Sequence, residues 1–135
     1  MLIRTGIGYD SHKLDYGVAL WLGGVRIEFD KGLVGHSDGD VLIHAIVDAL
    51  LGAAGLGDIG THFPSTNPTY KGVSSRIFLT TTCQKLKDSK WQVVNVDATI
   101  VAENPTLAPF IPEIRDLIAK DMNIRPSQVN IKATT

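Results

Sequence analysis

Apolar residues recur at helical spacing in three stretches of the chain, and these stretches predict its main helices. The stretch 40–54 is apolar almost all round and stops before Gly55, a pattern typical of a buried helix. A second helix is expected after Ser74 or Ser75, either of which can cap its first turn. A third is expected from about 109 to 122, with its apolar residues on one face.

Alternation of apolar and polar residues predicts short strands between these helices. The clearest strand is 92–101, in which every second residue from Val94 to Ile100 is apolar. Gly23 and Gly24 separate two apolar runs and favour a hairpin. The expected strands are 2–8, 18–22, 25–29, 92–101 and 129–134. Strands and helices mix without strict alternation, which favours an α+β sandwich.

Length and composition narrow the class of protein. The 135 residues fit one domain with a full core, which we expect to span 1–135. The net charge of −1 gives no broad basic face for nucleic acid, and Cys83 alone cannot build a disulfide framework. No apolar run reaches the roughly 18 residues of a membrane span. We therefore expect a cytoplasmic protein without a leader peptide and with no nucleic-acid or membrane partner.

One polar stripe interrupts the apolar helix expected over 40–54. It consists of Asp40, His44 and Asp48, four residues apart. Buried ionisable groups are costly unless they are paired or bind a metal. Two plainer interpretations stay open: the stripe faces solvent, or His44 makes an ordinary hydrogen bond in the core.

Asp10 and His12 offer ligands that would complete a metal site with His44. They lie two residues apart in the strand-like start of the chain, so their side chains point to the same face. One carboxylate and two imidazoles suit zinc, and three protein ligands leave the fourth tetrahedral position open, as in catalytic sites. A structural metal site in a non-catalytic, oligomerising module is the alternative, although no closing fourth ligand is evident.

His36 and Ser37 lie at the entry to the same helix. A hydroxyl beside the free N–H groups of a helix N-terminus is typical of a phosphate site. A plain helix cap, supplied by Ser37 or Asp38, is equally consistent with the pattern. The polar loop 58–69 is either a ligand-binding loop or a surface loop.

The chain carries an ordered series of motifs. They are Gly-Tyr-Asp-Ser-His at 8–12, Gly-His-Ser-Asp-Gly-Asp-Val at 35–41, Leu-Gly-Asp-Ile-Gly at 56–60, Phe-Pro at 63–64 and Lys-Ala-Thr-Thr at 132–135. This series resembles that of the 2-C-methyl-D-erythritol 2,4-cyclodiphosphate synthases over essentially the whole chain. The resemblance implies a homotrimer of ferredoxin-like α+β subunits, each with a mixed sheet packed against helices, and active sites between neighbours.

The resemblance also implies an activity and the residues that carry it. The chain would cyclise the small-molecule cytidine diphosphate substrate 4-diphosphocytidyl-2-C-methyl-D-erythritol 2-phosphate and release CMP, in the non-mevalonate pathway of isoprenoid biosynthesis. Zn²⁺ would bind Asp10, His12 and His44, and Mg²⁺ or Mn²⁺ would bridge the substrate diphosphate. His36 and Thr135 would be catalytic. The implied substrate contacts are Asp10, Ser11, His12, His36, Ser37, Asp58, Ile59, Gly60, Phe63, Pro64, Ser65, Thr66, Asn67, Ala102, Glu103, Asn104, Pro105, Thr106, Leu107, Ala108, Thr134 and Thr135.

Three features depart from the family pattern. Ser65 and Asn67 stand where aspartates are usual, and Thr106 stands where a lysine is favoured. The family continues past Thr135 with a glutamate that is the usual protein ligand of the second metal. Either this tail is truly absent, in which case we expect the chain to be inactive, or the protein continues beyond the printed sequence. The alternative function is a zinc-dependent phosphohydrolase, in which metal-bound hydroxide would give a linear product.

Overall fold

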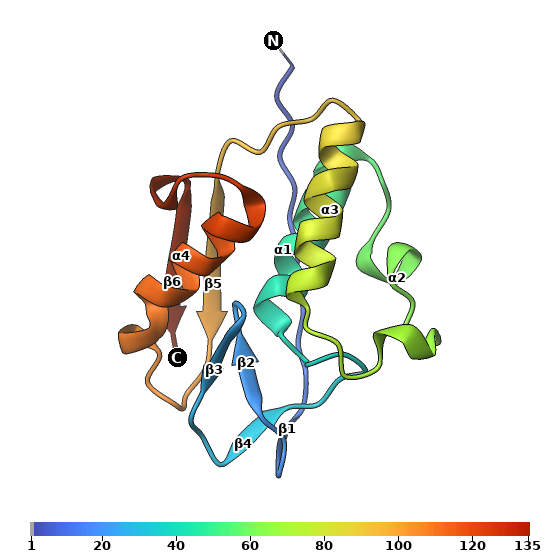
Figure 1. Cartoon of the computed structure of the whole chain (residues 1–135). Helices are drawn as coiled ribbons and strands as arrows, with labels where there is room; N and C mark the ends of the chain where they lie inside the picture. The colour runs from blue at the N-terminus through green and yellow to red at the C-terminus, as the bar shows by residue number, and fades with distance from the viewer. Residues whose placement is uncertain (1) are drawn as a thin grey trace.

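The computed structural model describes residues 2–135, and all three predicted main helices are present in it (Figure 1). Helix α1 is Val41–Ala54, α3 is Arg76–Asp88 and α4 is Ile111–Met122. Helices α1 and α3 pack side by side, while α4 lies against strand β6, Val129–Thr134. The predicted helix over 40–54 is confirmed to the residue at its C-terminal end, where Gly55 takes the left-handed conformation.

The strands form three two-stranded sheets. Their bounds are β1 Leu14–Tyr16, β2 Leu20–Leu22, β3 Val25–Ile27, β4 Lys31–Leu33, β5 Val96–Val101 and β6 Val129–Thr134. The pairs β1–β4 and β2–β3 are antiparallel, and β5–β6 is parallel. A parallel pair needs a crossover connection, which α4 provides. Over residues 2–135 these small sheets replace the single mixed sheet that the resemblance implied.

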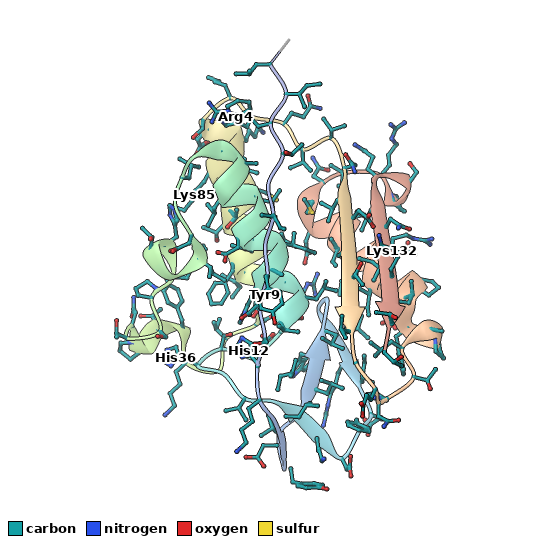
Figure 2. All side chains as sticks on the ribbon, turned by 180° about the vertical axis from the view of Figure 1, so that it is seen from behind. Arg4, Tyr9, His12, His36, Lys85 and Lys132 are labelled. Carbon is teal, nitrogen blue, oxygen red and sulfur yellow. The ribbon has the colours of Figure 1, made fainter. Side chains whose placement is uncertain are left out.

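The expected strand over 2–8 does not form. The segment runs extended along α1, as Figures 1 and 2 both show, but it pairs with no strand of residues 2–135. Its contact is with the helix backbone instead: a Cβ on Gly6 would lie 1.9 Å from the carbonyl oxygen of Ala49, and one on Gly8 would lie 1.8 Å from that of Ala45. The alternation of apolar residues over 2–8 therefore predicted an extended segment correctly. This segment packs against helix α1 and not against another strand.

Other boundaries also differ from the prediction: β2 and β3 are each two residues shorter than expected, and β1 and β4 were not predicted. Strand β5 begins at Val96, four residues later than expected, and Val94 is exposed. The loop expected over 58–69 contains the short helix α2, Ile59–His62, and the start of the 3₁₀ turn η1, Pro68–Tyr70. No helix in the described part of the chain is long and apolar enough to cross a membrane.

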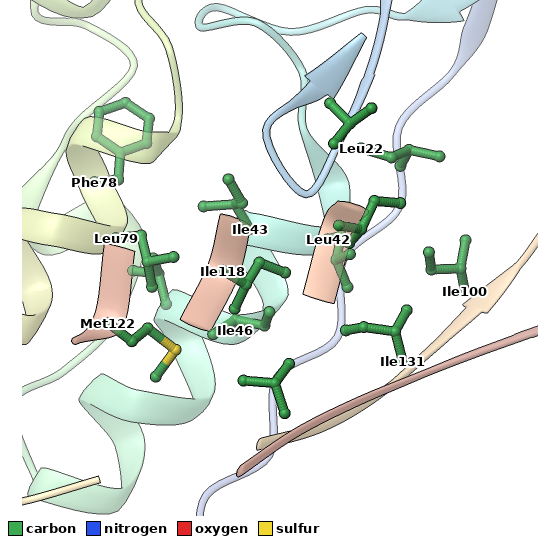
Figure 3. Close-up of a cluster of buried hydrophobic side chains, with 14 of the residues drawn as sticks. Leu22, Leu42, Ile43, Ile46, Phe78, Leu79, Ile100, Ile118, Met122 and Ile131 are labelled. Atoms are coloured by element: carbon green, nitrogen blue, oxygen red, sulfur yellow. The ribbon is translucent and has the colours of Figure 1, made fainter. Parts of the chain in front are cut away.

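One apolar core joins the helices to the sheets. Helix α1 contributes Ile43, Val47 and Leu51, none of which is exposed, and Leu79 of α3 and Ile118 of α4 belong to the same cluster (Figure 3). Helix α1 is therefore central to the core, as its nearly all-apolar sequence predicted. A side chain carried by this helix is held by packing on several sides.

Asp40 ties the start of α1 to the β2–β3 hairpin. Gly23 and Gly24 both have positive φ, as a two-residue hairpin turn requires, and their N–H groups donate to the Asp40 carboxylate at 2.9 and 2.7 Å. Asp40 also accepts from the N–H of Ile43, so it caps the helix in place of the predicted Ser37 or Asp38. Burial raises the pKa of Asp40 to about 7, although these backbone donors offset part of the rise.

Replacing Asp40 is expected to destabilise the protein strongly. Asp40→Ala leaves three N–H groups without their acceptor, two of them in the turn and one in the helix. The loss of a cap and of buried hydrogen bonds lowers the free energy of unfolding by about 2 kcal/mol or more. Urea unfolding measures this, with Asp15→Ala as the control because Asp15 is exposed. Equal stability of the two variants would contradict the role given to Asp40.

Thr82 is expected to tolerate loss of its hydroxyl. It is fully buried in α3, and its Oγ1 has no hydrogen-bond partner among the described residues. Thr82→Val removes this unpaired group at similar volume, so the free energy of unfolding should stay equal or rise by up to about 1 kcal/mol. Thr80→Val on the exposed face is the control. A clear loss of stability at position 82 alone would show that the hydroxyl has a partner.

Candidate metal centre

Three side chains from two segments converge at the N-terminal half of α1. Asp10 Oδ2 lies 2.8 Å from His12 Nε2 and 3.1 Å from His44 Nδ1, and the two nitrogens are 3.3 Å apart. This is the one group of at least three potential metal ligands found in residues 2–135. Asp10, His12 and His44 therefore lie close enough to share one metal ion, as their spacing in the sequence predicted, although Asp10 and His12 lie in an extended segment and not in a strand.

The orientation of His12 is set by a backbone carbonyl. Its Nδ1 lies 2.7 Å from the carbonyl oxygen of Val34, which can only accept, so Nδ1 carries the hydrogen. A neutral ring then presents a lone pair at Nε2, directly opposite Asp10 Oδ2. Two acceptors at 2.8 Å need a proton or a cation between them.

The donor set fits zinc. Bonds of about 2.0–2.1 Å at tetrahedral angles place the ligand atoms of zinc about 3.3 Å apart, close to the spacings between Asp10, His12 and His44. Imidazole nitrogen and carboxylate oxygen are both ordinary zinc ligands, and a site with three of them keeps a position for substrate. Burial lowers the pKa of His44, which favours the neutral form that can bind a metal.

In the polar stripe of α1, Asp40 and His44 are buried and Asp48 is half-buried, and each has a different partner. Asp40 holds the hairpin, His44 completes the ligand set, and Asp48 accepts the N–H of Ile59 at 2.8 Å. The last contact attaches the start of α2 to α1. The interpretation of the stripe as a solvent-facing edge is therefore wrong.

His36 and Ser37 lie beside the ligand set. His36 Nε2 donates to the carbonyl oxygen of Asn67 at 2.9 Å, and Ser37 Oγ lies 3.2 Å from His44 Nε2. In Figure 2, His12 and His36 both lie near the N-terminal end of α1. The contact with Asn67 connects the predicted phosphate site to the loop over 63–67, which lies about 30 residues further along the chain.

The predicted substrate contacts over 58–67 differ in how accessible they are. Asp58 is exposed and caps α2, and its hydrogen bonds with Thr61 lower its pKa. Ser65 and Thr66 are also exposed, whereas Phe63 is buried against Tyr70 and Phe78. The ring of Phe63 thus belongs to the core, which leaves its backbone and the polar residues after it to face a ligand.

The second predicted group of contacts borders a large cavity. The volume of this cavity is about 770 Å³, and Asp10, Ser11 and His12 form part of its wall. The wall also includes Ala102, Glu103, Asn104, Pro105 and Leu107. Thr134 is joined to this segment, since its carbonyl oxygen accepts the N–H of Ala102 at 2.9 Å. His36, Ser37 and the 58–67 segment do not line the cavity.

Two polar residues at the site are not indicated by any pattern in the sequence. Asp38 and Ser75 were considered only as helix caps, yet Ser75 Oγ lies 2.8 Å from His44 Nε2 and donates to Asp38. The two residues are 37 positions apart, and neither belongs to a spacing pattern with His44. Their role follows only from the packing of α3 against α1.

Known proteins resemble this chain in sequence and in fold. Residues 3–135 match the model of the YgbB family. A 2-C-methyl-D-erythritol 2,4-cyclodiphosphate synthase of Neisseria gonorrhoeae is 56% identical over 98% of this chain and 83% of its own length, and one of Clostridium perfringens is 54% identical over 98% and 85%. A solved structure of such a synthase in a CDP-bound form is 34% identical, with a TM-score of 0.92 over 98% of this chain and 88% of that one.

Gly8→Ala is expected to disrupt the metal centre. The added Cβ would overlap the carbonyl oxygen of Ala45, so the segment that carries Asp10 and His12 must move away from α1. We expect zinc affinity, measured by competition with a chelator, to fall about tenfold or more, that is by about 1.4 kcal/mol. Gly52→Ala is the control, because nothing lies within 4 Å of its Cβ. Unchanged affinity in Gly8→Ala would contradict the close approach.

Proposed function

This chain belongs to the YgbB family and is a cyclodiphosphate synthase of isoprenoid biosynthesis like its relatives, and from this premise we propose how its residues carry out the reaction. The substrate is 4-diphosphocytidyl-2-C-methyl-D-erythritol 2-phosphate, and the products are 2-C-methyl-D-erythritol 2,4-cyclodiphosphate and CMP. An oxygen of the 2-phosphate attacks the β-phosphorus, the bond from that phosphorus to the bridging oxygen breaks, and CMP leaves. Because the nucleophile and the electrophile are in one molecule, positioning supplies much of the rate.

Asp10, His12 and His44 would hold the zinc ion. The observation that supports this most directly is the triangle of donor atoms at 2.8, 3.1 and 3.3 Å, which is close to the ligand spacing of tetrahedral zinc. When bound, zinc would neutralise negative charge on the phosphoryl group that is attacked. The helix α1 and the carbonyl of Val34 hold two of the ligands in place before substrate arrives.

His36 and Thr135 would stabilise charge on the phosphates during transfer. His36 is fixed by its hydrogen bond to the Asn67 carbonyl, beside Ser37 and the metal ligands. Thr135 follows β6, next to Thr134, and both are exposed. Because the Nε2–H of His36 is bonded to Asn67, His36 would donate to phosphate from Nδ1 as an imidazolium, and Thr135 would donate through its hydroxyl. Phosphoryl transfer relies on fixed positive charge and hydrogen-bond donors around the phosphate oxygens more than on covalent help from the protein.

The 102–108 segment would bind the cytidine group, mainly through its backbone. We propose that active sites lie between neighbouring subunits of a ferredoxin-like homotrimer in the cytoplasm. What supports a shared site is that His36 and the 58–67 segment lie outside the cavity that residues 102–105 and Leu107 line. Two subunits can supply these two groups of contacts from opposite sides of one substrate.

A second divalent ion, Mg²⁺ or Mn²⁺, would bridge the substrate diphosphate. Residues 2–135 hold no second cluster of three or more potential metal ligands besides that of Asp10, His12 and His44. The substrate phosphates would therefore provide most of its ligands, which is common for magnesium in phosphoryl-transfer sites.

A product assay by ³¹P NMR tests this function. The full-length protein, with zinc, magnesium and the diphosphocytidyl substrate, should give a cyclic diphosphate signal and CMP. His44→Ala should lower the rate by about 10²-fold or more, because it removes a zinc ligand. His62→Ala is the control, since His62 contacts the carbonyl of Leu56 and lies outside the ligand cluster.

The outcomes separate the candidate functions. A linear phosphate product in place of the cyclic one would favour a zinc-dependent phosphohydrolase. Full activity of His44→Ala would contradict the assigned zinc role while leaving the family membership intact.

A further inference from the structure

We propose that Asp38 and Ser75 are positioning residues that fix the tautomer of His44, so that its Nδ1 lone pair faces the metal. This inference rests on the metal centre proposed above. Ser75 contacts the side of the His44 ring opposite to Asp10 and His12, and Asp38 in turn holds the hydroxyl of Ser75. Neither would touch the metal or the substrate, and they would act only through His44.

The contacts form a continuous chain from α1 to α3 and back to the loop before α1. His44 Nε2 lies 2.8 Å from Ser75 Oγ, and Ser75 Oγ contacts Asp38 Oδ1. Asp38 Oδ2 accepts the backbone N–H of Ser75 at 2.9 Å, and Oδ1 also accepts the N–H of Asp40 at 3.0 Å. Ser75 is fully buried, and His44 is nearly so.

The direction of each hydrogen follows from what each group can do. An ionised Asp38 can only accept, so the Ser75 hydroxyl donates its hydrogen to Asp38. The lone pairs of Ser75 Oγ then face His44 Nε2, which must carry a hydrogen in order to bond. In a neutral imidazole the other nitrogen, Nδ1, is left with its lone pair, and this is the atom within 3.3 Å of His12 Nε2.

Ser37 does not take the place of Ser75 as the main hydrogen-bond partner of His44 Nε2. Its Oγ lies 3.2 Å from His44 Nε2 and 3.4 Å from Ser75 Oγ, both longer than the contact between His44 and Ser75. Ser37 has no hydrogen bond to Asp38 that would orient its own hydroxyl. The pair of Asp38 and Ser75 is therefore the part of the network that determines which nitrogen of His44 is protonated.

Loss of this pair should weaken metal binding without removing a ligand. In Ser75→Ala, the strongest acceptor of His44 Nε2–H is gone, so the other tautomer and a rotated ring become accessible. In Asp38→Asn, the amide can donate to Ser75 Oγ and turn its hydroxyl toward His44, which would favour a hydrogen on Nδ1. Partners of metal-bound histidines typically contribute about 10–100-fold to metal affinity.

The experiment measures zinc affinity by chelator competition and the imidazole nitrogens of His44 by ¹⁵N NMR. We expect Ser75→Ala and Asp38→Asn each to weaken zinc binding about 10–100-fold. The His44 signal of the parent should show hydrogen on Nε2, and the variants should lose this single state. Ser74→Ala is the matched control: Ser74 is exposed and adjacent, and its Oγ contacts only the N–H of Arg76.

Each possible result either supports or contradicts the positioning role of Asp38 and Ser75. Parent-like affinity and an unchanged His44 signal in Ser75→Ala would overturn the proposal while leaving the metal centre in place. Failure of the parent to bind zinc would overturn the metal centre and this inference with it. A Ser75→Ala protein that does not fold leaves Asp38→Asn to give the answer by the same two measurements.

Discussion

The site depends on keeping three electron-pair donors close together. Asp10 Oδ2, His12 Nε2 and His44 Nδ1 lie within 3.3 Å of one another, and such donors repel unless a cation or a proton lies between them. The surrounding structure holds them against this repulsion: the core packing of α1 fixes His44, and the Val34 carbonyl fixes His12. A divalent cation with an open coordination position would convert this arrangement into a phosphate site, as proposed above.

Helix α1 organises the protein around this arrangement. Its apolar residues form the centre of the core, while Asp40 and Asp48 on its polar stripe hold the β2–β3 turn and the start of α2. Gly6 and Gly8 let the extended segment approach the helix closely enough for Asp10 and His12 to reach His44. The fourteen-residue helix α1 therefore determines how the core packs, how the hairpin turn is held and where the metal ligand His44 lies.

Patterns within one segment could be predicted, and the metal-ligand set was the one contact between distant segments that could be predicted as well, because its residue types suggest a shared metal ion. The helix over 40–54, strand β6 and the ligand set of Asp10, His12 and His44 follow from periodicity and spacing, and all three are present. The extended segment 2–8 lacks a strand partner because its neighbour is a helix, which apolar alternation does not reveal. Ser75 reaches His44 only because α3 packs on α1, so no local pattern indicates it.

Anomalous diffraction at the zinc absorption edge, from crystals of the protein grown with zinc, is the most direct test of the central claim. We predict one strong peak at about 2.0–2.2 Å from Asp10 Oδ2, His12 Nε2 and His44 Nδ1, with a fourth position filled by solvent or phosphate. A peak coordinated by other residues, or by a different nitrogen of His44, would contradict the account of how this fold builds its active centre.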